Sequence, residues 1–142
     1  MKTSARNQFS GKVEQVLIGA VNAEIYLSSK GGATIVASIT KESVATLGIE
    51  VGVEAIALVK APQITVVTDF GGYKVSARNQ LAGTVVAVKP GAVNSEVDIE
   101  LSGGEIVAAT VTNDSVATLG LSVGLPATAI FKAGAVILAV QS

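Results

Sequence analysis

The stretch that decides the fold is GAVNAEIYLSSKGGATIVASITKESVATLG, residues 19–48, which returns as GAVNSEVDIELSGGEIVAATVTNDSVATLG at residues 91–120. The same offset of 72 aligns SARNQ at residues 4–8 with SARNQ at residues 76–80. Extended over 66 aligned pairs, the offset gives 29 identities. Two copies of such a long unit indicate a tandem pair of modules rather than a solenoid.

The repeat also predicts where the modules meet. We expect a first domain at residues 1–69, a linker at residues 70–75 and a second domain at residues 76–142. The linker begins with FGGY, in which Gly71 and Gly72 can turn the chain.

Alternating apolar and polar residues predict strands in each copy. In the first copy, the run at residues 21–27 is followed by Gly31-Gly32 and a second run, as in a β-hairpin. Two short runs, residues 55–60 and 63–68, flank Pro62, and the whole pattern recurs in the second copy. The composition agrees, because it is rich in Val and Thr, which favour strands, and lacks Trp.

A short helix interrupts each copy. In TKESVATLG, Thr40 is a good N-cap and Gly48 can end the helix in the left-handed conformation. Thr112 and Gly120 repeat these positions. About five strands and one helix per copy predict an all-β fold of two tandem OB-like Greek-key β-barrels.

The composition excludes several functions. With no Cys and no His, thiol chemistry, a catalytic triad and the usual metal ligands are absent, and the acidic residues show no paired spacing. We therefore expect no enzyme, no catalytic cofactor and no direct metal ligands. A net charge of −1 disfavours a nucleic-acid partner. No apolar run reaches membrane or signal-peptide length, so we expect a cytoplasmic protein without a membrane partner.

What remains in each copy suits an anion. Arg6 offers a planar fork of N–H donors, Lys60 a compact charge, and the helix start brings Thr40 and Ser43. The second copy repeats the set as Arg78, Thr112, Ser115 and Lys132. Simpler interpretations stay open: the cations could be solvated surface charges, the threonines only N-caps, and Asn7 and Asn79 only turn residues.

These motifs also carry a family resemblance. SARN, GAVN-x-E, T-x-x-S-V-A-x-L-G and a later Lys-Ala pair, in that order and twice over, closely resemble the molbindin or Mop domain, so the chain is similar to a di-Mop molbindin. The resemblance implies an OB-like barrel, a homotrimer, and pockets between subunits that bind molybdate or tungstate.

The resemblance also implies the ligand-binding residues. One kind of pocket would be lined by Ser4, Ala5, Arg6, Thr40, Ser43, Lys60 and Ala61, and its counterpart by Ser76, Ala77, Arg78, Thr112, Ser115, Lys132 and Ala133. A second kind, near the three-fold axis, would use Val21, Asn22, Val93 and Asn94. The main departure from the family pattern is Gly134, which stands in the second copy where the first has Pro62.

The function we expect is molybdate storage and homeostasis, because no segment has the pattern of a DNA-binding helix-turn-helix or an ATPase domain. Two alternatives stay open. An anion-sensing adaptor would change partners when loaded. A single-strand nucleic-acid-binding OB module would need a basic groove with stacked aromatics, and the five aromatic residues show no repeat-matched array.

Overall fold

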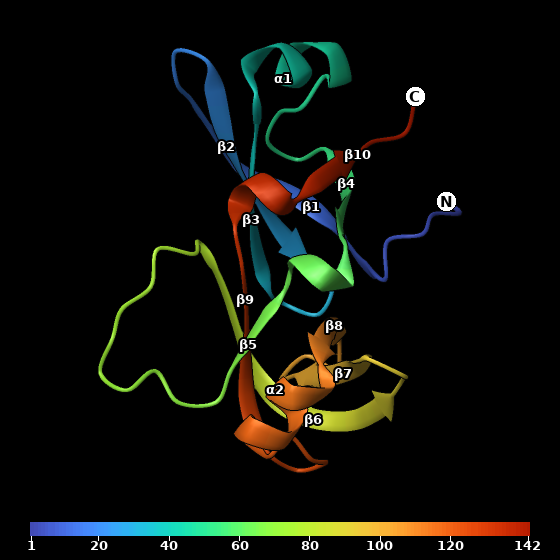
Figure 1. Cartoon of the computed structure of the whole chain (residues 1–142). Coiled ribbons are helices and arrows are strands. Elements are labelled where there is room, and N and C mark those ends of the chain that lie inside the picture. The colour runs from blue at the N-terminus through green and yellow to red at the C-terminus, as the bar shows by residue number, and fades with distance from the viewer.

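The computed structural model describes residues 1 to 142, and both copies form the same succession of elements (Figure 1). The first copy contains β1 (Asn7–Ile18), β2 (Asn22–Ser29), β3 (Thr34–Thr40), α1 (Lys41–Leu47), β4 (Glu54–Val59), the 3₁₀ turn η1 (Ala61–Gln63) and β5 (Thr65–Val67). The second contains β6 (Asn79–Pro90), β7 (Asn94–Leu101), β8 (Ile106–Thr112), α2 (Asn113–Leu119), β9 (Pro126–Phe131), η2 (Ala133–Ala135) and β10 (Ile137–Ala139). The predicted fold class is confirmed. Neither α-helix has the length or apolar character of a membrane span.

The two copies exchange their last strands. One antiparallel sheet has the order β10-β4-β1-β2-β3, and the other has the order β5-β9-β6-β7-β8. Figure 1 shows β10 beside β4 in one half of the molecule and β5 beside β9 in the other. The predicted linker at residues 70–75 separates the two copies of the sequence repeat. Each folded sheet, however, contains four strands from one copy and a fifth strand from the other.

The longest strand of each copy, β1 or β6, was not located by the sequence pattern. The first half of β1 pairs with β4 and its second half with β2, and the register shifts between Val13 and Gln15. Such a bulge bends a strand and breaks its alternation, which explains why periodicity did not reveal it. Gly11 lies before the bulge, where β1 passes close to β2 and a Cβ would come within 2.0 Å of the Ser28 carbonyl oxygen.

One hydrophobic core spans both copies. It contains 27 buried residues, mostly Val, Ile and Ala, with Phe9 and Phe131 as its aromatic members. Because β5 and β10 carry core residues into the opposite half, we expect the copies to unfold together rather than as independent domains.

The helix ends agree with the predicted caps. The Thr40 hydroxyl accepts a hydrogen bond from the Ser43 backbone N–H at 3.1 Å, and Gly48 adopts the left-handed conformation with φ of 65°. Thr112 and Ser115 repeat this bond at 3.1 Å, and Gly120 has φ of 64°. With seven residues each, the helices depend on packing against the strands for their stability.

Candidate functional site

The two cationic residues predicted for the site in each copy lie at one end of its sheet. Strands β1 and β4 are antiparallel, and their last ladder pair is Asn7 with Val59. Arg6 and Lys60 come directly beyond this pair, so two motifs that are 54 residues apart in sequence end side by side. The ladder pair of Asn79 with Phe131 places Arg78 and Lys132 in the same way.

The asparagine of each SARN motif fixes this end onto the opposite copy. Asn7 is 1% exposed, accepts a hydrogen bond from the Ala108 N–H at 2.7 Å and donates to the carbonyl oxygens of Ala108 at 2.8 Å and Val59 at 3.1 Å. Asn79 makes the equivalent pair of bonds to Val36, at 2.7 and 2.8 Å. The interpretation of these asparagines as turn residues is therefore wrong. They are buried clamps, and their retention in both copies was the signal that could have revealed them.

Both arginines also reach across the copies. Arg6 pairs with Glu96 at 2.5 Å, and Arg78 pairs with Glu24 at 2.7 Å. The two glutamates are the acidic residue of GAVN-x-E, and the sequence pattern did not reveal this role. Arg6 and Arg78 are thus exposed side chains with specific carboxylate partners, not freely solvated charges.

The Lys-Ala pairs open the two 3₁₀ turns. Lys60 and Lys132 are exposed and make no ion pair, while Ala61 and Ala133 are buried. The first N–H groups of a helical turn have no partner within it, so the turn presents donors beside each lysine. Gly134 adds one donor that Pro62 lacks, and within the chain β10 and β5 both still pair antiparallel with their neighbours.

The hydroxyl residues lie at the opposite end of β1 from Arg6. Asn22 pairs with Thr40 across β2 and β3, and the Val21 carbonyl accepts the Lys41 N–H at 2.8 Å. Thr40 also donates to Ser43 Oγ at 2.8 Å, which leaves the Ser43 hydroxyl hydrogen free for an acceptor. Within one copy, the seven residues assigned to a pocket therefore fall into two sets. One is a cationic set around Arg6 and Lys60, and the other is a hydroxyl-bearing set, Thr40 and Ser43.

The cationic set of each copy lies against the opposite copy, on the strand that leads to that copy's hydroxyl-bearing set. Asn7 is bound to Ala108 on β8, and Arg6 is bound to Glu96, whose ladder partner is Thr110. The chain from Asn7 back to Arg6 thus runs along β8 toward Thr112, where α2 begins. η1 and η2 pack against β8 and β3 respectively, so both crossings follow the same plan.

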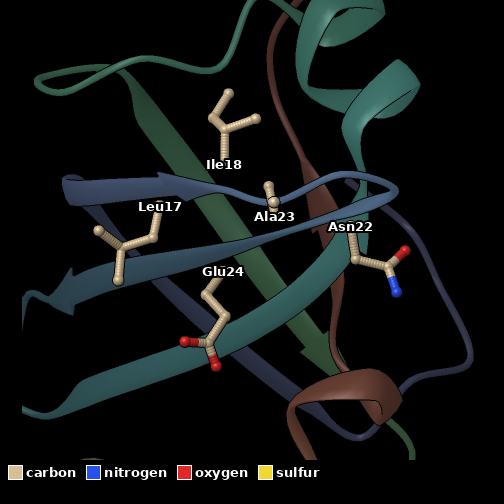
Figure 2. Close-up of a pocket in the computed structure, with 6 residues that line it drawn as sticks. Leu17, Ile18, Asn22, Ala23 and Glu24 are labelled. Carbon is tan, nitrogen blue, oxygen red and sulfur yellow. The ribbon is translucent and has the colours of Figure 1, made fainter.

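One of the residues predicted for a second kind of pocket, Asn22, lines an open depression. It has a volume of about 280 Å³ and is lined by Leu17, Ile18, Gly19, Asn22, Ala23 and Glu24. Figure 2 shows the side chains of Leu17, Ile18, Asn22 and Glu24 spread in different directions rather than toward one centre. Val21 and Val93, in the two copies of the motif, are 72% and 71% exposed.

The carboxylate environment differs between the copies. Beside Glu96, the Lys89 ammonium lies 3.2 Å from Glu96 and 3.1 Å from Asp98. Hydrogen bonds to Asp98 and then to Glu96 raise the pKa of Lys89 above its ordinary value. The other Asp98 oxygen, Oδ1, is buried and has no hydrogen-bond partner.

Comparisons with known proteins agree with this architecture. The TOBE domain family model matches residues 3–66 and 75–138. The chain is 46% identical over 141 residues to the molybdenum transport protein ModE of Herbaspirillum seropedicae, and 41% identical over 139 residues to the molybdenum-pterin-binding protein MopA of Rhodobacter capsulatus. These alignments cover 99% and 98% of the chain but only 52% of each relative, so the chain spans about half the length of these curated relatives.

A solved structure covers the whole fold. It is the cytoplasmic molybdate-binding protein ModG with molybdate bound, which matches with a TM-score of 0.96 and 47% identity. The match covers 99% of this chain and 100% of that one. With two family matches in tandem and the same complete fold, this chain belongs to the TOBE-domain family, in its paired di-Mop molbindin form.

Proposed function

We propose that this chain binds molybdate, or its analogue tungstate, and serves as a cytoplasmic, non-catalytic store that buffers the oxyanion. The observation that carries the proposal is that the cationic set of each copy lies on the opposite copy and extends toward its hydroxyl-bearing set. The ModG structure supports it, because a protein 47% identical with the same fold is described as holding molybdate.

The chemistry of the cationic set and the hydroxyl-bearing set suits a tetrahedral dianion. Arg6 and Lys60 would neutralise its charge, while Thr112, Ser115 and the start of η1 would donate hydrogen bonds to its oxygens. The second pocket uses the equivalent residues, which are Arg78, Lys132, Thr40, Ser43 and the start of η2. Ser4, Ala5, Ser76 and Ala77 complete the two pockets beside the arginines.

We further propose that the chain forms a homotrimer in which neighbouring chains close these pockets. Apolar side chains are exposed at matched positions of both copies, as expected for a surface covered by another subunit. The matched pairs are Val21 with Val93, Leu47 with Leu119, and Val51 with Val123. Val21, Asn22, Val93 and Asn94 would then lie where three chains meet and form a weaker anion site.

Isothermal titration of the purified protein with sodium molybdate, sodium tungstate and sodium sulfate tests this function. We expect molybdate and tungstate to bind in the micromolar range or tighter, and the double variant Arg6→Ala/Arg78→Ala to lose most of this binding. Lys12→Thr is the matched control, because it removes an exposed cation where the second copy already has Thr84. Millimolar or absent molybdate binding by the wild-type protein would reject the proposal.

A regulatory adaptor is the second candidate, because related proteins of about twice this length include the DNA-binding transcriptional dual regulator ModE of Escherichia coli, which is 33% identical over 140 residues. Affinity capture with the full chain, with and without molybdate, separates the two roles. A partner that is retained only in one ligand state would favour the adaptor.

A further inference from the structure

The two arginines of the repeated SARN motif have unequal partners. Arg78 uses both arms of its guanidinium, because Nη1 donates to Glu24 and Nη2 donates to the Tyr26 hydroxyl, each at 2.7 Å. Arg6 makes one ion pair, from Nη2 to Glu96. Its second arm has no partner within the chain.

The difference follows from two substitutions between the copies. At the position of Tyr26 the second copy has Asp98, and at the position of Leu17 it has Lys89. Lys89 contacts Glu96, the partner of Arg6, whereas Leu17 cannot pair with Glu24, the partner of Arg78.

Releasing each arginine toward a ligand therefore costs a different amount. An oxyanion that takes both arms of a guanidinium must displace the carboxylate, because two anions then compete for the same donors. When Arg6 leaves, Glu96 keeps a cationic partner in Lys89, which it shares with Asp98. When Arg78 leaves, Glu24 and Tyr26 both lose their partner. Water restores only part of the loss, because the Glu24 side chain is 33% exposed, compared with 18% for Glu96.

We propose that Arg6 captures the oxyanion first and that Glu24 and Tyr26 restrain Arg78, so that the chain has two inequivalent classes of arginine-dependent site. This inference rests on the proposed function, in which both arginines bind the ligand. Tyr26, Glu24 and Lys89 are then positioning residues, which set affinity through the arginines without touching the anion.

Calorimetric titration with sodium molybdate tests the inference once single variants assign the classes. Arg6→Ala should remove the tighter class and Arg78→Ala the weaker one. Tyr26→Phe, which changes no charge, should tighten the weaker class by roughly two- to fivefold, the range expected for an exposed hydrogen-bonded pair. Leu17→Lys should act in the same direction by giving Glu24 a new partner, and Lys89→Leu should weaken the tighter class.

The control for added charge is Thr84→Lys, which introduces a cation where the first copy has Lys12 and should leave the ratio of the two affinities unchanged. Thermal unfolding of every variant verifies that the fold is intact. Equal affinities for the two classes, or a response of both classes to Tyr26→Phe, would overturn the inference while leaving the proposed function intact. Unchanged binding by both arginine variants would instead contradict the proposed function.

Discussion

The two copies of the module are alike where they cross and different around the carboxylates that hold their arginines. Asn7 and Asn79 are both buried and both bind the third strand of the opposite copy. Around the arginines, Tyr26 and Leu17 on one side correspond to Asp98 and Lys89 on the other. A buried polar clamp tolerates no change because its partners would be left without hydrogen bonds, whereas partly exposed charges can be rearranged at low cost.

The largest expected effect comes from removing a clamp. Asn7→Ala should lower the free energy of unfolding by about 3 kcal/mol, because it leaves the N–H and carbonyl of Ala108 without buried partners. Asn79→Ala should cost about 1 kcal/mol less, since Asn7 makes one more bond, to Val59. Denaturant unfolding measures both values. A larger loss of unfolding free energy for Asn79→Ala than for Asn7→Ala would show that the number of hydrogen bonds does not determine how much each asparagine stabilises the fold.

The contact between the two hairpins gives a smaller contrast. A Cβ on Gly103 would lie 1.8 Å from the Gly31 carbonyl oxygen, whereas a Cβ on Gly31 would meet the Glu105 side chain at 2.3 Å. The Glu105 side chain can move aside, but it then loses the hydrogen bond that it accepts from Ser29. Gly103→Ala should therefore destabilise by about 2 kcal/mol, and Gly31→Ala by about 1 kcal/mol. Equal unfolding midpoints for the two alanine variants would mean that the hairpin backbones can separate.

The helix caps should show no contrast. Thr40→Ala and Thr112→Ala remove the same 3.1 Å bond to the backbone of Ser43 or Ser115, so each should cost about 1 kcal/mol. Thermal unfolding of the two variants should give matching midpoints. A difference well above the error would place one helix under a tertiary constraint that the other lacks.

The smallest effect concerns Lys89 and alkaline pH. Because the folded state raises the pKa of Lys89, its contribution to stability is complete below the unfolded value of about 10.4 and is lost as the pH rises through the folded value. The melting temperature of the wild-type protein should exceed that of Lys89→Leu at pH 8, and the gap should narrow above pH of about 10.4. A gap that is constant with pH would assign the effect to packing. The first copy has Leu17 at this position, so Leu17→Ala should show no such pH dependence.

Local sequence patterns predicted much of the fold and named the candidate site residues. The hairpin glycines, the caps at Thr40 and Gly48, and the repeated Arg, Lys, Thr and Ser positions could all be read without coordinates, because they depend on neighbouring residues or on the repeat itself. The bent strand β1 could not be located, since its bulge interrupts the alternation. The sequence also did not show that Arg6 and Thr40 of one copy lie at opposite ends of β1.

The sequence by itself determined that this chain is a duplicated β-module with a retained set of Arg, Lys, Thr and Ser side chains. Only the tertiary structure decided which copy supplies each part, namely the exchange of β5 and β10, the asparagine clamps and the arginine–glutamate pairs between copies. The physical reason is that two repeats of one module present similar strand edges and the same motifs. Pairing within a copy or between copies then satisfies the same local pattern, and the choice rests on how the whole core packs.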